Sequence, residues 1–165
     1  MVKLATTGHM DVSANGIPLV RRALDGLLSH YDGQELLGFS CVAPGADSVF
    51  ADALLRAGGR LVAVIPSRDY RSTQVGAEHA ATYDRLLAAA DEVVVMPYES
   101  AGRAAYEAAN AELLRRAERL VAIWDGSPPT GKGGGTADVV ASARAARMPV
   151  DVIWPTGTTR ASALR

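Results

Sequence analysis

The run Arg60-Leu-Val-Ala-Val-Ile-Pro66 decides the fold class of this chain. Its five central residues are apolar without alternation, a pattern typical of a strand that helices cover on both faces. A strand with one face in water would alternate apolar and polar residues. Similar apolar runs recur at residues 4–7, 36–42, 92–96, 120–124 and 150–154. Together these runs predict a mostly parallel sheet of about six strands.

Helical patterns rich in Ala, Leu and Arg separate these strands, over residues 17–30, 46–57, 76–90, 103–117 and 136–147. Strands that alternate with helices along the whole chain predict a single Rossmann-like, doubly wound α/β domain with helices on both faces of the sheet. We expect this domain to span residues 1–155. Residues 156–165 lack apolar periodicity, and we expect them to form a flexible C-terminal tail.

Length and charge exclude several classes of protein. The chain has 165 residues, and its 17 Lys+Arg against 18 Asp+Glu give a formal net charge of −1. That length is too short for two full α/β domains, and 48% hydrophobic residues argue against disorder. Nucleic-acid binding usually needs a basic face with interleaved aromatic residues, whereas aromatics make up only 5% of this chain. We therefore expect no nucleic-acid partner.

The cysteine count and the hydropathy pattern indicate in which compartment the protein is expected. The single cysteine, Cys41, lies inside a predicted strand, so we expect it in the core, with neither a disulfide framework nor a thiolate metal cage. The first residues lack the long apolar run of a signal peptide. No stretch approaches the roughly 20 apolar residues of a membrane span. We expect a soluble cytoplasmic protein with no membrane partner.

The segments that directly follow the strands are the place to look for a site, because open parallel sheets bind ligands outside the carboxyl ends of their strands. Small residues and glycines gather there, in segments 6–9, 43–47, 66–70, 125–126 and 130–136. Glycines at a helix start let backbone N–H groups approach an anion, and the helix N-terminus adds partial positive charge. The sequence predicts a phosphate cradle, with a flexible linker as the alternative for the glycine run.

Three familiar motifs fail in this sequence. Residues 126–132 match GxxxxGK, but the Ser or Thr that would hold magnesium is replaced by Gly133. The three-glycine dinucleotide fingerprint is absent after the first strand. The three histidines show no metal-binding spacing. We therefore expect neither a cofactor nor a metal.

Five blocks in order resemble the SLOG superfamily: Gly8-His9, Ser40-Cys-Val-Ala-Pro-Gly-Ala-Asp47, Ala53-Leu-Leu-Arg-Ala-Gly-Gly59, Leu61-Val-Ala-Val-Ile-Pro66 and Gly133-Gly-Gly-Thr-Ala-Asp138. The resemblance covers residues 3–155. This superfamily groups phosphoribohydrolases often labelled lysine-decarboxylase-like with the DNA-processing protein DprA and nucleotide-sensing domains.

The resemblance implies a Rossmann-like fold that binds a nucleotide or phosphoribosyl ligand. Gly133, Gly134, Gly135 and Thr136 would hold its phosphate, and Thr7 and Gly8 would line the opposite wall. His9, Gly45 and Asp47 lie in the other predicted site loops and complete this group of ligand-binding candidates. Because the family commonly dimerises through its helices, the resemblance also allows a homodimer.

One departure from the family concerns catalysis. The phosphoribohydrolases carry GGxGTxxE, whose glutamate acts on the ribosyl centre, but the third residue beyond Thr136 here is Val139. Asp138 stands one position earlier, which rotates its carboxylate by about 100° on a helix. Asp138 is thus a candidate catalytic carboxylate, with helix capping as the alternative.

Four further candidates follow from position. Arg68 follows a strand and would bind phosphate, although its segment also suits a plain turn. Tyr106 and Asn110 share one helix face, from which they would contact the ligand or a neighbouring loop. Asp125 ends a strand and would bond a ribose hydroxyl or start a turn.

Two functions fit these residues. The first is an enzyme, a hydrolase that cleaves the N-glycosidic bond of a nucleoside monophosphate with Asp138 as the carboxylate. The second is a non-catalytic module that senses a nucleotide-derived signal. Nucleotide binding at the carboxyl edge of the sheet is common to both.

Overall fold

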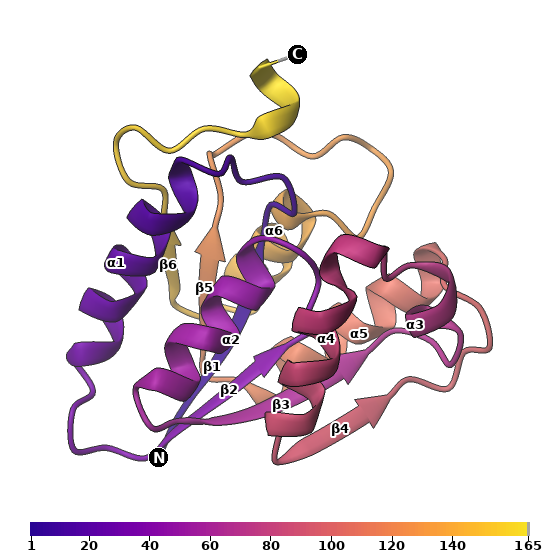
Figure 1. Ribbon diagram of the computed structural model, residues 1–165, viewed down its shortest axis with the longest axis horizontal. Coiled ribbons are helices and arrows are strands. Elements are labelled where there is room, and N and C mark those ends of the chain that lie inside the picture. The colour runs from indigo at the N-terminus through magenta and orange to yellow at the C-terminus, as the bar shows by residue number, and fades with distance from the viewer. Residues whose placement is uncertain (165) are drawn as a thin grey trace.

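Six parallel strands form one sheet in the order β4-β3-β2-β1-β5-β6 in the computed structural model, which describes residues 1–164 (Figure 1). The strands are β1 Val2–Gly8, β2 Leu36–Ser40, β3 Arg60–Ile65, β4 Glu92–Val95, β5 Arg119–Ile123 and β6 Val150–Ile153. The expected Rossmann-like α/β fold is confirmed.

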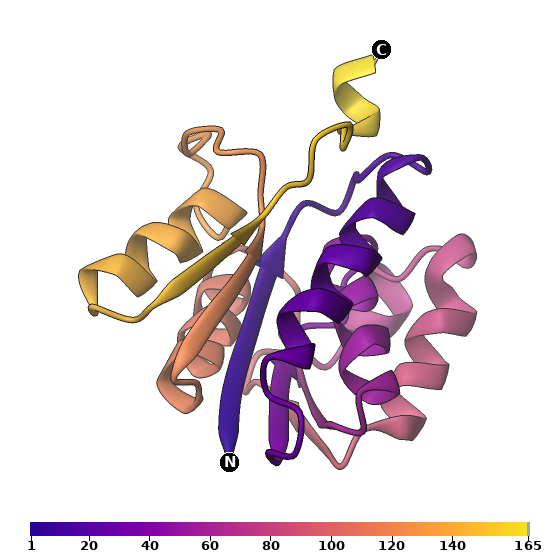
Figure 2. The same cartoon turned by 90° about the vertical axis from the view of Figure 1, so that its left-hand side faces the viewer.

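Helices cover both faces of this sheet, as Figure 2 shows. On one face lie α1 Gly16–Ser29, α2 Ala46–Arg56 and α4 Ala77–Ala89, and on the other lie α5 Arg103–Arg116 and α6 Thr136–Ala145. Each begins and ends within two residues of its prediction. The sequence pattern missed two short elements, α3 Tyr70–Thr73 and the 3-10 helix η1 Ala161–Leu164.

The strand β3 shows why its sequence does not alternate. Leu61, Ala63 and Ile65 pack in the core beneath α1, α2 and α4, whereas Val62 and Val64 pack in the core beneath α5 and α6. All five are at most 4% exposed. Full burial of one such Leu or Val side chain contributes about 1.5–3 kcal/mol, so both faces of this strand hold the layers together.

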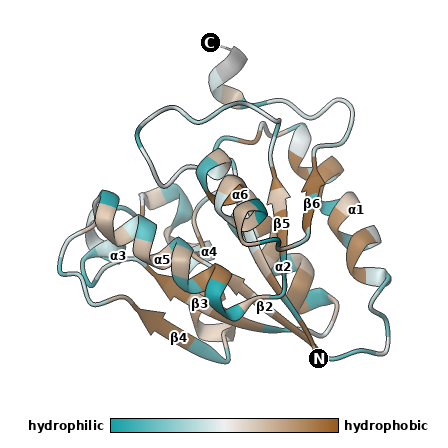
Figure 3. Cartoon of the chain, turned by 180° about the vertical axis from the view of Figure 1, so that it is seen from behind, coloured by the Kyte–Doolittle hydropathy of each residue, from teal (hydrophilic) through white to brown (hydrophobic). Residues whose placement is uncertain are grey.

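The edge strand β4 is less covered. Val93 and Val95 remain 44% and 48% exposed, although Figure 3 shows β3 and β4 both rich in hydrophobic residues. Neighbours of Val93 and Val95 in the ladder are Ala63 and Ile65, which are buried. The contrast places the well-packed centre of the domain over β1, β2, β3 and β5.

The direction of winding reverses at β1. The chain continues from β1 through β2 and β3 to β4 on one side, and then places β5 and β6 on the other side of β1. Gly8 ends β1 opposite Ile123 of β5. In doubly wound sheets the crevice at such a reversal is the usual ligand site.

Residues 156–164, which we expected to be a flexible tail, lie against the loop that follows β1. The Ser13 N–H donates to the Thr159 carbonyl at 2.8 Å, the Arg160 Nε–H donates to Asp11 Oδ1 at 2.9 Å, and Thr158 is 7% exposed. Hydrogen bonds supply these contacts, so the segment needs no apolar periodicity. Arg165 lies outside the described residues.

Among the described residues, no helix combines the length and the apolar character that crossing a membrane requires.

Candidate functional site

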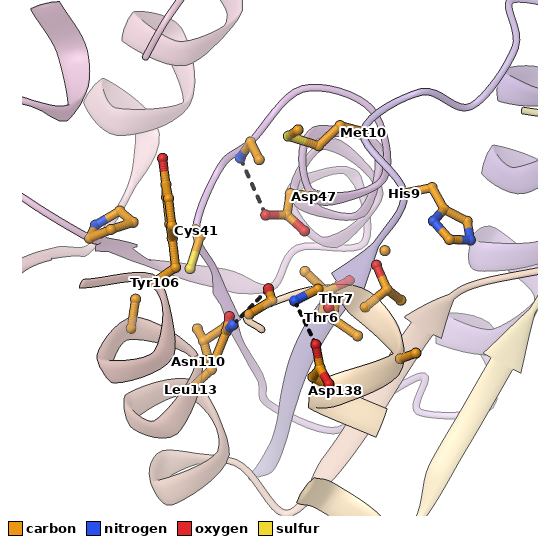
Figure 4. Close-up of a pocket in the computed structure, with 18 of the residues that line it drawn as sticks. Thr6, Thr7, His9, Met10, Cys41, Asp47, Tyr106, Asn110, Leu113 and Asp138 are labelled. Atoms are coloured by element: carbon orange, nitrogen blue, oxygen red, sulfur yellow. Dashed lines mark hydrogen bonds between the residues drawn. The ribbon is translucent and has the colours of Figure 1, made fainter. Parts of the chain in front are cut away.

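A cavity of about 510 Å³ opens at the carboxyl edge of the sheet (Figure 4). The loops after β1, β2 and β5 form its walls, together with α5 and the start of α6. Its volume lies within the roughly 300–1,000 Å³ typical of small-molecule sites. The site therefore lies where the reversal of winding predicts it.

Ten of the fourteen residues singled out from the sequence line this cavity: Thr7, Gly8, His9, Asp47, Tyr106, Asn110, Gly134, Gly135, Thr136 and Asp138. The four that lie outside its wall are Gly45, Arg68, Gly133 and Asp125. They come from three loops, those after β2, β3 and β5, and each lies outside the cavity wall for its own structural reason.

The glycine loop leads from β5 to the start of α6 and is bonded to α5 through Asn110. The Asn110 side-chain amide donates to the Gly134 carbonyl at 3.2 Å, which is the neighbouring-loop contact among the alternatives for Asn110. Gly134 has a φ of 70°, a conformation that disfavours any residue with a side chain. Gly133, with a φ of 73°, lies beside Arg103 instead and lines a neighbouring pocket.

Asp138 caps its own helix. Its Oδ2 accepts the Gly135 N–H at 3.3 Å, which is the capping alternative for this residue. The carboxylate nevertheless lines the cavity. Asp138 is therefore close enough to touch a ligand but already has one hydrogen-bond partner.

The loop after β1 places His9 beside Asp125. His9 is 6% exposed, its Nε2 lies 2.9 Å from Asp125 Oδ1, and its ring meets Trp154 edge-on at 5.5 Å. Partial burial raises the pKa of Asp125, but hydrogen bonds from Ser127 and His9 outweigh it and lower that pKa to about 2. Asp125 is thus an ionised residue that orients His9 and the turn to Ser127.

The loop after β2 places Asp47 in the first turn of α2. Asp47 is 8% exposed, and its Oδ2 accepts the Ala43 N–H at 3.3 Å. Burial raises the pKa of Asp47 to about 7, although the Ala43 hydrogen bond lowers it in part. Gly45 precedes it with a φ of 75°, where a Cβ would lie 2.5 Å from the Met10 carbonyl oxygen. Gly45 therefore shapes this loop without lining the cavity.

Backbone strain marks the same loop. Val42 is fully buried with a φ of 57°, which is rare for a β-branched residue. Ser40 Oγ accepts its N–H at 3.0 Å, and His79 Nε2 lies 2.9 Å from its carbonyl oxygen. The expectation that Cys41 lies inside a strand is wrong, because β2 ends at Ser40; Cys41 is partly buried, packs against the core on one side and lines the cavity on the other.

Arg68 lies away from the cavity. Its guanidinium pairs with Glu99 on the surface, and its N–H donates to the Tyr98 carbonyl at 2.9 Å. Two residues later, Tyr70 does line the cavity and is 6% exposed. The cation in the cavity wall is Arg160, which sequence reasoning missed because it lies in the segment expected to be a tail.

Among the described residues, no group of three or more His, Cys, Asp or Glu side chains is placed to hold a metal ion. The cavity instead combines backbone amides, hydroxyls, one buried carboxyl and two tyrosines. Such a lining suits hydrogen bonding to a polar organic ligand.

Comparison with solved structures shows which proteins share this architecture. DNA processing protein A (DprA) of Streptococcus pneumoniae matches with a TM-score of 0.69 and 20% identity, over 95% of this chain and 52% of that one. DprA of Helicobacter pylori, described for its single-stranded DNA binding mode, matches with a TM-score of 0.65 and 12% identity, over 99% of this chain and 70% of that one. The chain shares its fold with these two DprA proteins.

A third match is the Moco carrier protein of Chlamydomonas reinhardtii, with a TM-score of 0.57 and 23% identity, over 92% of this chain and 75% of that one. This chain spans about half the length of the pneumococcal DprA. No protein-family model matches the sequence, and no curated protein matches it either. The resemblance drawn from the five sequence blocks is confirmed at the level of the fold.

One expectation is wrong. Near-zero net charge and few aromatics led us to expect no nucleic-acid partner, yet the fold is shared with a protein described for its binding of single-stranded DNA. Net charge describes the whole surface, whereas a cradle of backbone amides at one sheet edge binds phosphate without basic side chains. Charge alone therefore does not exclude nucleic acid for this fold.

Proposed function

We propose that this protein binds a nucleotide or a related phosphorylated small molecule, with the phosphate at the start of α6. One observation carries the proposal: the first turn of α6 faces the cavity. Gly135, Thr136 and Ala137 line the cavity, and in the described chain the Thr136 and Ala137 N–H groups donate to no protein acceptor. Free N–H groups and the helix dipole together favour an anion.

The local packing supports a preformed cradle. Asn110 holds the Gly134 carbonyl, and Gly135 enters the helix with a φ of −80° and a ψ of 172°. Arg160 adds a positive charge to the opposite wall, although it also pairs with Asp11. A site whose donors are already oriented loses less entropy on binding than one that must be ordered.

The experiment compares the AMP affinity of two alanine variants, at Gly135 and at Gly76, which have similar backbone dihedral angles. Gly135→Ala fits the helix start sterically, because the new Cβ would lie 3.7 Å from Asp138 Oδ2, but it places a methyl group beside the cradle. We expect AMP affinity, measured by calorimetry, to fall about tenfold, which corresponds to about 1.4 kcal/mol.

The matched control is Gly76→Ala. Gly76 is the extended N-cap of α4, with φ −71° and ψ 163°, and a Cβ there meets nothing within 4 Å. We expect this variant to bind AMP like the wild type. Equal affinity of AMP for both variants and the wild type would contradict a phosphate cradle at α6.

Hydrolysis of the nucleotide is tested in the same samples by chromatography of the released base. Asp138 is the carboxylate that this reaction would use, and its Oδ2 is held by the Gly135 N–H. We therefore propose binding without cleavage as the basal activity. Base release that Asp138→Asn abolishes would instead establish a hydrolase.

A second candidate, single-stranded DNA binding, is favoured by the fold shared with Helicobacter pylori DprA over 99% of this chain. The same α6 cradle would take one phosphate of the strand. A labelled oligonucleotide in fluorescence anisotropy separates the candidates. Tight binding of the oligonucleotide with no binding of AMP, NAD or ADP-ribose would replace the first proposal with the second.

A further inference from the structure

The carboxyl group of Asp47 is buried in the cavity wall, and only one of its two oxygens has a hydrogen-bond partner in the described part of the protein. Its residue is 8% exposed, and its Oδ2 accepts one N–H, from Ala43. Among the described residues no donor reaches Oδ1. Figure 4 shows the side chain among the cavity-lining residues with that single hydrogen bond. A carboxyl oxygen that lines a cavity and has no partner in the protein can accept a hydrogen bond from a ligand there or donate one to it.

The neighbours of Asp47 do not neutralise it. Cys41 follows β2 and Tyr70 belongs to α3, and the pKa of each is raised by burial and by the charge of Asp47. His79 of α4 is engaged with the Val42 carbonyl. In the part of the chain that the structure describes, Asp47 forms no ion pair. The other titratable groups in the cavity wall are His9, Tyr106, Asp138 and Arg160.

The position of Asp47 relative to the α6 cradle indicates how long a ligand must be to contact both. The cradle follows β5 and Asp47 follows β2, with β1 between them. Adjacent strands lie about 4.8 Å apart, so β2 and β5 are about 10 Å apart, and the two sites, which belong to helices on opposite faces of the sheet, are separated by at least about that distance. A phosphate and a nucleobase joined through a pentose span such a distance.

We infer that Asp47 is the residue that selects the ring of the bound nucleotide, by hydrogen bonds to the polar edge of the base. This inference rests on the proposed function. A protonated carboxyl offers one donor and one acceptor, which complements the amino group and ring nitrogen of adenine. An ionised carboxylate offers only acceptors, which complements the ring N–H and amino group of guanine. The protonation of Asp47 therefore sets the preferred base.

The test measures the affinity of AMP, GMP and ribose 5-phosphate for the full chain at pH 6 and pH 8. All three probes carry the same titrating phosphate, so division by the ribose 5-phosphate affinity isolates the base. With a pKa of about 7, the protonated fraction of Asp47 falls from about 90% to about 10% between these pH values. We expect the AMP ratio to fall about tenfold and the GMP ratio to rise.

The diagnostic variant is Asp47→Asn, whose amide always offers one donor and one acceptor. We expect its AMP ratio to be independent of pH and its GMP binding at pH 8 to be about tenfold weaker than in the wild type. Asp52→Asn is the matched control, because Asp52 lies on the same helix and pairs on the surface with Arg85. This control is expected to keep the pH dependence of the wild type.

Three results would overturn the inference. They are a wild-type AMP ratio that does not change with pH, an Asp47→Asn variant that keeps the wild-type pH dependence, and bases that add nothing to the affinity of ribose 5-phosphate. The pH dependence of the wild-type AMP ratio tests the inference even if the Asp47→Asn variant does not fold. Failure of all three probes to bind would overturn the proposed function as well, whereas binding of ribose 5-phosphate alone would overturn only the role of Asp47.

Discussion

A methyl group at Gly8 should destabilise the fold at the point where the site is built. An added Cβ would lie 2.4 Å from the Ala46 Cβ, 2.7 Å from the Ile123 carbonyl oxygen and 2.9 Å from the Ile123 Cβ. Two of these atoms belong to short or branched side chains and one to the backbone, so the contact can be relieved only if β1, α2 or β5 moves. Overpacking of this kind costs about 1–3 kcal/mol.

We place Gly8→Ala at the upper end of this range, at about 2–3 kcal/mol, because all three contacts are too short. For a domain of this size that loss lowers the melting temperature by about 4–12 °C. Urea unfolding followed by circular dichroism measures the free energy directly. The control is Gly26→Ala in α1, where a Cβ meets nothing within 4 Å, and this variant should gain about 0.5–1 kcal/mol.

A double variant identifies the clash. Ala46→Gly removes one of the three contacts of the new methyl group but leaves the Ile123 carbonyl oxygen in place. The double variant Gly8→Ala with Ala46→Gly should therefore recover only part of the loss, measured as a coupling energy in a double-mutant cycle. A Gly8→Ala stability within 0.5 kcal/mol of the wild type would refute the close approach of β1, α2 and β5.

Two further predictions concern buried polar groups. Ser40→Ala removes the acceptor of the buried Val42 N–H and should cost about 1–3 kcal/mol in urea unfolding; an unchanged midpoint would contradict this. The lowered pKa of Asp125 stabilises the folded state above about pH 4, and this contribution is lost as pH falls through about 2. The free energy of unfolding of Asp125→Asn should therefore be about 2 kcal/mol lower than that of the wild type at pH 7 and should depend less on pH below about pH 4. An unchanged pH dependence in that range would contradict the contact between His9 and Asp125.

The strands and helices could be predicted because each has a signal in local sequence. The two-sided burial of β3 appears directly in its unbroken apolar run, and the Gly58-Gly59 pair marks the end of α2. The four-residue α3 lacks such a signal, because one turn of helix is too short to show a period. The ordered packing of segment 156–164 was also not predicted, because hydrogen bonds to the loop after β1 hold the segment and its sequence has no apolar stripe.

Cavity-lining residues could be predicted where their position along the backbone determines the contact. They could not be predicted where the direction of the side chain determines it. Glycines were expected at the site because they follow strand ends, and Gly8, Gly134 and Gly135 do line the cavity, since that placement depends on position in the chain. Arg68 and Tyr70 lie in one predicted loop, yet only Tyr70 lines the cavity, since the turn sends Arg68 to Glu99. Cys41 was misplaced because the strained conformation of Val42, which ends the strand early, leaves no mark in the composition.

The surface charges bear on how a protein with a net charge of −1 would bind the proposed anionic ligand. Ten arginines form ion pairs with acidic side chains, so much of the basic charge on this molecule is locally balanced. Exposed pairs of this kind add about 0–1 kcal/mol each to stability and leave little field to steer a distant anion. If the proposed binding is correct, short-range donors inside the cavity would supply it, and we expect the affinity for AMP to depend on salt much less than that of a protein that binds through a basic surface. A steep loss of AMP affinity between 50 and 200 mM salt, by the orders of magnitude seen when many phosphate contacts are made by Lys and Arg, would show that the surface and not the cradle binds the ligand.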